Sequence, residues 1–121
     1  MRAGERPWTV RLTAAAEADF EEILRWTVAQ FGEAQARIYA ETLSAALNDL
    51  VAGPTIVGAR KRDDILKGLF TLHVARKGRK GRHFVMFRVA SAPDRDVIEV
   101  LRLLHEAVDP RRHLPAADES T

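Results

Sequence analysis

Two stretches in the second half of the chain decide the fold: HFVMFRV, residues His83 to Val89, and VIEVLRLLH, residues Val97 to His105. Both are rich in β-branched, aromatic and other apolar residues and have the length of a β-strand. The segment between them, SAPDRD at Ser91 to Asp96, has the composition of a turn. Two such runs joined by a turn predict neighbouring antiparallel strands.

The residues just before this pair extend the predicted sheet. Leu69 to Ala75 reads as another strand, and the glycine-containing stretch Arg76 to Arg82 reads as a hairpin loop that leads into His83. The stretch Thr55 to Gly68 is irregular and charged, which predicts a loop. The second half is therefore expected to be a three-strand antiparallel meander.

The first half is predicted to be mainly helical. A short strand at Trp8 to Leu12 precedes Thr13, a suitable N-cap for a helix over Ala14 to Phe31. Gly32 ends that helix, and a second helix is expected over Glu33 to Ala52. So short a link predicts an antiparallel helix hairpin. The apolar positions expected in the core are Phe20, Ile23, Leu24, Leu43, Leu47 and Leu50.

Together these elements predict an α+β domain with the helices on one face of a mostly antiparallel sheet. We expect one domain over residues 8–114, with a flexible N-terminus (1–7) and a flexible C-terminal tail (115–121). The 121 residues are 46% hydrophobic and 30% charged, as in soluble globular proteins. Without cysteine there can be no disulfide and no cysteine-ligated zinc. No apolar run is long enough to cross a membrane, and a cytoplasmic location is expected.

The last predicted strand is apolar on both sides, which raises a question about its second face. In regular alternation Ile98, Val100 and Leu104 point one way, and Val97, Leu101 and Leu103 point the other way. Two helices can cover only one of these faces. Either the C-terminal segment Glu106 to Leu114 folds back as a lid, or a protein partner covers the exposed apolar surface.

Basic residues gather in two places although the net charge is only +2. Such clusters attract phosphates or acidic partners, but a charged hairpin tip is also a common solvated feature. The first cluster is Arg60, Lys61 and Arg62, and the second is Arg76, Lys77, Arg79, Lys80 and Arg82.

The remaining polar residues suggest no metal site and no cofactor. His73 and His83 flank the basic hairpin without a carboxylate or a close histidine spacing to complete a ligand set. His105 closes an apolar strand and is expected to bond to the backbone in preference to acting as a general base. Arg88, Glu99 and Arg102 stand on apolar strands, which predicts an internal Arg–Glu pair or an arginine that faces a phosphate or an acidic partner.

Several of these segments, in this order, resemble the RelE/ParE family of toxins from type II toxin–antitoxin modules, and more closely its ParE branch. The segments are RLTAAAEADFEEI from Arg11, FG at Phe31, QARIY from Gln35, HFVMFRV, and VIEVLRLLH followed by Asp109. The resemblance implies a growth-inhibiting toxin, of the kind used in plasmid stabilisation, that forms a hetero-oligomer with its cognate antitoxin. We expect the antitoxin to contact Val97, Leu101, Leu103 and Arg88.

The ParE branch implies inhibition of DNA gyrase through protein binding, with no catalytic residues and with the basic clusters as target contacts. The alternative is a RelE-like, metal-independent endoribonuclease that cuts messenger RNA on the ribosome with Lys and Arg side chains and a C-terminal Tyr. Tyr39, the sole tyrosine, falls on the predicted core stripe of the second helix. The remaining candidates for such chemistry are Arg88, Arg102 and His105. A member that has lost toxicity and only binds its partner is a third possibility.

Overall fold

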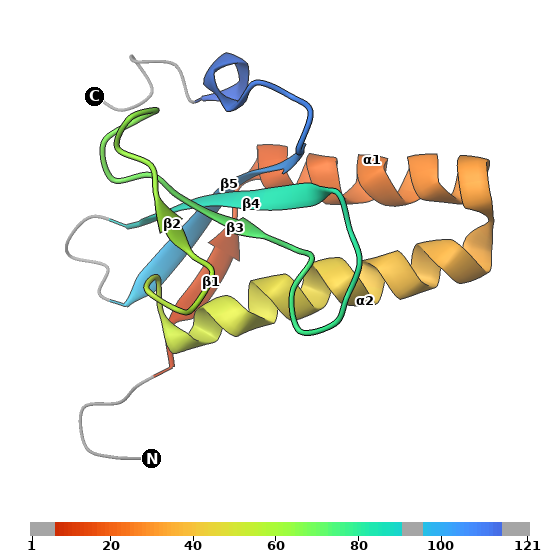
Figure 1. Cartoon of the computed structure of the whole chain (residues 1–121), viewed down its shortest axis with the longest axis horizontal. Coiled ribbons are helices and arrows are strands. Elements are labelled where there is room, and N and C mark those ends of the chain that lie inside the picture. Colours follow the sequence, from red (N-terminus) through yellow and green to blue (C-terminus); the bar gives the residue numbers. More distant parts are fainter. Residues whose placement is uncertain (1–6, 91–95, 115–121) are drawn as a thin grey trace.

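The computed structural model describes residues 7–90 and 96–114, which form a helix hairpin packed on a mixed sheet (Figure 1). The sheet has five strands in the order β1-β5-β4-β3-β2. The pair β1 and β5 is parallel and all other neighbours are antiparallel. In chain order the elements are β1 (Thr9–Leu12), α1 (Ala14–Phe31), α2 (Glu33–Asp49), the 3₁₀ turn η1 (Leu50–Ala52), β2 (Arg60–Lys61), β3 (Phe70–His73), β4 (His83–Val89), β5 (Val97–His105) and the 3₁₀ turn η2 (Pro110–His113).

The predicted architecture is confirmed, with three differences in the elements. The stretch Thr55 to Gly68 was expected to be a loop throughout, but Arg60–Lys61 form β2 and pair with β3. The meander therefore has four strands. The helix expected to reach Ala52 tightens into η1 after Asp49, before Gly53 ends it with a φ of 116°. The strand β3 is shorter than the predicted Leu69 to Ala75.

Thr13 starts α1 as predicted and also ties it to the sheet. Its Oγ1 accepts a hydrogen bond from the Ala16 N–H at 3.1 Å and donates one to the Leu101 carbonyl at 2.9 Å. Gly32 separates the two helices with a φ of 91°, which side chains other than glycine rarely adopt. The hairpin thus turns at once, and its tip extends beyond the sheet (Figure 1).

The helix-side core contains the residues expected there. Leu43 and Leu50 are fully buried, Ile23 is nearly so, and Phe20, Leu24 and Leu47 are half-buried against them. Phe87 lies in this core and stacks on Phe70, with ring centroids 5.3 Å apart. These contacts confirm the predicted register of both helices.

A β-bulge in β5 changes which side chains share a face. Phe87 pairs with Val100 and Met86 pairs with Arg102, so Leu101 has no partner in the register. One extra residue reverses the alternation. The helix-side core therefore takes Ile98, Val100 and Leu103, whereas Leu101 and Leu104 face the second side. The predicted grouping of these residues, which assumed unbroken alternation, was wrong.

The second sheet face is covered by the chain itself. Ile65 and Leu66, from the connection between β2 and β3, pack with Leu114 on a cluster that includes Met86, Leu101 and Leu104. Of the two alternatives for this face, the structure favours the lid, because Leu114 of the C-terminal segment contributes to the cover. The predicted flexible ends fall mostly on residues 1–6 and 115–121, which lie outside the described residues. In the described part of the chain no helix has the length and apolar character needed to cross a membrane.

Candidate functional site

A hollow of about 310 Å³ lies where the tip of the helix hairpin meets the β3–β4 connection. We call it the Tyr39 hollow. Helix α1 contributes two exposed aromatic side chains, Trp26 and Phe31, whose rings meet edge to face at 5.8 Å. The strands contribute two imidazoles and the connection contributes two cations. The full lining is Trp26, Thr27, Phe31, Gln35, Tyr39, Lys80, Gly81, Arg82, His83 and His105.

Gly81 lets the β3–β4 connection lie directly against α2. A Cβ atom at this position would be 2.6 Å from Cγ2 of Val74 and 2.9 Å from the hydroxyl oxygen of Tyr39. The absence of a side chain therefore permits the close approach. It also allows the backbone N–H of Arg82 to donate to the Tyr39 hydroxyl at 3.1 Å.

Tyr39 and His83 form the central polar contact of the hollow. The Tyr39 hydroxyl oxygen is 2.6 Å from Nδ1 of His83. Burial raises the pKa of Tyr39. Burial, with the nearby His105 and His73, lowers the pKa of His83 to about 4. Near neutral pH the phenol is therefore protonated and the imidazole is neutral. The hydroxyl accepts from Arg82 and donates to Nδ1 of His83, so Nε2 of His83 carries the ring proton.

His105 completes the floor of the hollow beside His83. The two residues face each other across β4 and β5, with ring centroids 5.2 Å apart and nearly perpendicular planes. Nδ1 of His105 accepts a hydrogen bond from the Ala107 N–H at 3.0 Å, which confirms the expected bond to the backbone. In its neutral form His105 therefore also carries its proton on Nε2.

His73 lies next to this pair but has a different role. Its Nε2 is 2.7 Å from a carboxylate oxygen of Glu106, and its Nδ1 accepts from the Ala75 N–H. The contact with His73, and then the nearby charges of His73 and Arg82, lower the pKa of Glu106. Arg82 approaches the same carboxylate at 3.5 Å. Within residues 7–90 and 96–114 no three His, Asp or Glu side chains are placed to hold a metal ion.

The predicted basic clusters lie in different places and are differently engaged. Arg76 donates to Asp49 at 2.9 Å and to the Val57 carbonyl at 2.8 Å, and Lys77 also contacts Asp49, at 3.1 Å. These two cations hold the β3–β4 connection to the end of α2. Arg79 and Lys80 are exposed, and no ion pair within the described residues involves them.

The cluster Arg60, Lys61 and Arg62 lies apart from the β3–β4 connection. Arg60 and Arg62 line a separate hollow of about 260 Å³ with His73 and Phe84. Arg62 makes a two-pronged contact with Asp64, at 3.0 Å for both hydrogen bonds. Lys61 is 3.8 Å from Asp63. Within the described residues, five of these eight cations therefore contact a carboxylate: Lys61, Arg62, Arg76, Lys77 and Arg82.

The three residues considered for RNA cleavage are not brought together. Arg88 pairs with Glu99 at 2.9 Å, which confirms the expected internal Arg–Glu pair. Arg102 makes two hydrogen bonds to Asp19 on α1, at 2.7 and 2.8 Å. The contact with Asp19 raises the pKa of Arg102. Arg88 and His83 stand at opposite ends of β4, about 17 Å apart along the strand, and His105 lies opposite His83.

Two of the residues expected to bind an antitoxin are inaccessible. Leu103 is 3% exposed, because the bulge turns it into the helix-side core. Leu101 is 4% exposed, because the cluster on the second sheet face covers it. The prediction that they form an exposed contact surface was therefore wrong. Val97 and Arg88 are half-exposed.

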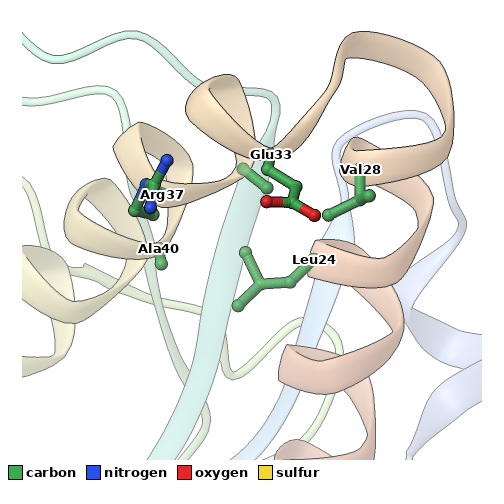
Figure 2. Close-up of a pocket in the computed structure, with 6 residues that line it drawn as sticks. Leu24, Val28, Glu33, Arg37 and Ala40 are labelled. Atoms are coloured by element: carbon green, nitrogen blue, oxygen red, sulfur yellow. The ribbon is translucent and has the colours of Figure 1, made fainter.

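A third hollow lies in the helix hairpin itself and was not expected from the sequence. It has a volume of about 300 Å³, and Ala36 and Ala40 leave the space open. Figure 2 shows Leu24 and Val28 facing Glu33 and Ala40 across the gap between α1 and α2.

The chain as a whole matches a known family. The family model described as the ParE toxin of the type II toxin–antitoxin system, parDE, matches residues 10–110. The chain belongs to the ParE toxin family. The resemblance found in the sequence is thereby confirmed, and the matched range spans every strand of the sheet except one residue of β1.

Curated relatives carry the same family name. The chain is 34% identical over 103 residues to "Toxin ParE1" of Mycobacterium tuberculosis, covering 85% of this chain and 94% of the relative. It is 29% identical over 104 residues to "Toxin ParE1" of Caulobacter vibrioides, covering 86% and 95%. The alignments therefore include nearly the whole of each relative and most of this ParE-family chain.

Two solved structures share the fold. A chain of the chromosomal ParDE system from P. aeruginosa superposes with a TM-score of 0.66 at 20% identity, covering 81% of this chain and 95% of that chain. A chain of the RelBE2 toxin–antitoxin complex from Mycobacterium tuberculosis superposes with a TM-score of 0.53 at 22% identity, covering 82% and 98%. At these identities the likeness establishes the arrangement of helices and strands.

Proposed function

We propose that this ParE-family toxin acts in the cytoplasm by binding DNA gyrase, and that a cognate antitoxin holds it inactive. One observation favours a toxin that acts by binding a protein over a toxin that cleaves RNA. Arg88 and Arg102 are each held by an internal carboxylate, and His105 lies at the far end of the β4–β5 pair from Arg88, so the three do not surround one reacting phosphate. Two of the three candidate residues of the ribonuclease alternative, Arg88 and Arg102, are therefore engaged in internal pairs.

The antitoxin proposal is supported by the names of the relatives and by surface features of the chain. Both solved structures come from toxin–antitoxin systems, and one is described as a toxin–antitoxin complex. Trp26, Phe31 and Ile38 are 55%, 65% and 55% exposed, around the tip of the helix hairpin. Exposed aromatic side chains beside cations are typical anchors of protein interfaces. A disordered antitoxin segment that folds on binding fits such a surface.

The experiment is induced expression in a bacterial host with two readouts taken from the same cells. One is the amount of gyrase trapped on broken DNA, and the other is the map of messenger 5′ ends on translating ribosomes. Gyrase-linked breaks without new messenger ends are expected. Site-specific messenger cuts without trapped gyrase would contradict the proposal, and the absence of both signals would mean that toxicity has been lost.

A single variant separates binding from catalysis. His105→Asn keeps an acceptor for the Ala107 N–H and removes the imidazole ring. If toxicity arises from a spread-out protein interface, this variant should weaken gyrase trapping only a few-fold. Loss of a general base would instead cost about two or more orders of magnitude in rate. The matched control is Arg112→Gln, an exposed change within the 3₁₀ turn η2 that should alter neither readout.

A further inference from the structure

We infer that the Tyr39 hollow is a binding site for a phosphate monoester carried by a planar aromatic group, as in a nucleoside monophosphate. The hollow includes Lys80 and Arg82 of the basic cluster expected to contact gyrase, but ligand binding to it can be measured on the purified chain without gyrase. The inference rests on three features of the hollow: paired imidazole donors, cations that remain available, and an exposed aromatic wall. Its volume of about 310 Å³ is at the lower end of the range for small-molecule sites.

The hydrogen bonds around the two imidazoles fix where their donors point. The Nδ1 atoms of His83 and His105 are both occupied, by the Tyr39 hydroxyl and by the Ala107 N–H. Each ring therefore offers Nε2–H, for which no hydrogen bond occurs within the described residues. No buried side-chain nitrogen or oxygen lacks a partner in that part of the chain. Both Nε2 atoms are therefore in contact with solvent, where a ligand can reach them.

The charge of the hollow favours an anion. Lys80 lines it and makes no ion pair within residues 7–90 and 96–114. Arg82 lines it with a side chain that is 77% exposed and only a 3.5 Å contact to Glu106. The negative charges of Glu106 and Asp19 reach His83. His73 already holds the Glu106 carboxylate at 2.7 Å, and Arg102 holds that of Asp19. Two imidazole donors and two cations suit a group with three acceptor oxygens, which describes a phosphate monoester better than a carboxylate.

The exposed aromatic side chains of the hollow indicate a second, planar group on the ligand. Trp26 and Phe31 line the same hollow although they are 55% and 65% exposed, and the Tyr39 ring lies 5.5 Å from that of His83. Flat aromatic faces bind nucleobases by stacking with little sequence preference. A phosphate on the basic side and a base on the Trp26 side would use both halves of the hollow.

The test is a titration of the purified full chain, labelled with ¹⁵N, with three probes: adenosine 5′-monophosphate, adenosine and inorganic phosphate. Shifts in the Trp26 indole and in the His83 and His105 ring signals report on the site. The chain has two tryptophans, so Trp26→Phe assigns the indole signal. Adenosine 5′-monophosphate should bind about tenfold or more tightly than either part alone, since one charged hydrogen bond or one stacked base is worth about that factor.

Two variants should separate the contribution of the phosphate group to the affinity from that of the base. Lys80→Ala should weaken both the nucleotide and inorganic phosphate about tenfold, whereas Trp26→Ala should weaken the nucleotide and leave phosphate unchanged. The matched control is Lys67→Ala, an exposed lysine outside the hollow, which should change neither. Equal binding of the nucleotide and adenosine, or of the nucleotide and phosphate, would overturn the inference even without variants. A competition experiment with an acetylated Asp-Phe-Glu peptide tests the other occupant. If the peptide displaces the nucleotide and binds more tightly, the hollow binds an acidic protein segment and the inference is overturned.

Discussion

The hydroxyl oxygen of Tyr39 on α2 lies 2.6 Å from Nδ1 of His83 on β4, although the two residues are 44 positions apart in the chain. This contact connects the helix hairpin to the sheet at the floor of the Tyr39 hollow. Since His83 is half-buried and neutral there, the stability of the fold should depend on pH.

The pH dependence has a definite direction. The pKa of His83 is about 4 in the folded chain and 6.5 in its ordinary state. The unfolded chain takes up a proton as the pH falls through 6.5, whereas the folded chain resists protonation until about 4. The contribution of His83 to the free energy of unfolding is therefore fully present above pH 6.5, and it is lost as the pH falls towards 4. Because the ring is partly exposed, we expect a loss of about 1–2 kcal/mol, less than the full shift would give.

Urea unfolding at pH 7.5 and pH 4.5 measures this effect. His83→Asn keeps an acceptor for the Tyr39 hydroxyl and cannot titrate in this range. The wild-type chain should lose more unfolding free energy between the two pH values than this variant does. Equal losses in the two chains would assign the pH dependence to other groups.

Gly81→Ala should destabilise the chain by about 1–3 kcal/mol, because the new Cβ meets Val74 and Tyr39 at distances that require a shift. The measurement is the unfolding free energy of four chains: wild type, Gly81→Ala, Val74→Ala and the double variant. Removing the Val74 methyl groups makes room, so the double variant should be more stable than the sum of the single effects predicts. Additive effects would mean that the two positions do not touch.

Asp19→Ala should cost about 2–3 kcal/mol of unfolding free energy. The carboxylate accepts two hydrogen bonds from Arg102 and one from the Leu103 N–H at 2.9 Å, and its side chain is only 15% exposed. The control is Glu22→Ala on the same helix, whose pair with Arg25 is 71% and 66% exposed. That change should cost less than about 0.5 kcal/mol. If both variants lose a similar amount of unfolding free energy, Asp19 does not stabilise the contact between α1 and β5.

Leu43→Ala should cost about 3–5 kcal/mol, because Leu43 is fully buried in the helix-side core. Leu47, one turn later, is only half-buried against the same core, and its change to Ala should cost about 2 kcal/mol. Thermal or urea unfolding of both variants checks the order. A cost below about 0.5 kcal/mol for Leu47 would place it on the surface and contradict the register of α2.

The helices and most strands could be predicted because each is specified locally. Thr13, Gly32 and Gly53 mark helix ends by their own backbone or capping chemistry, and Leu43 and Leu50 follow the helical period. The bulge at Leu101 could not be predicted, because it depends on how β5 pairs with β4 and leaves the composition of the strand unchanged. The bulge also turns Leu103 into the helix-side core, where it is not available as an antitoxin contact.

The Tyr39 hollow was missed for a related reason. Tyr39 was assigned to the core from its helical position, and its ring does pack there. Its hydroxyl nevertheless reaches His83, since a tyrosine has an apolar body and a polar tip. The one available signal was Gly81 within a charged hairpin, because an isolated glycine often marks a close approach of the backbone. Which residue it approaches is a property of the tertiary fold.

The interior place of β5, between the first strand of the chain and β4, has a consequence for how the protein is made. β5 is flanked by β1 and β4, and the parallel pairing joins Thr9 to Val97. On a ribosome, β1 and the helix hairpin emerge long before the strand that completes their sheet. Contacts between such distant parts of a chain form slowly, because a long loop must close first. A nascent chain therefore has no finished sheet until β5 has been synthesised, and interrupted translation yields fragments that lack the fold.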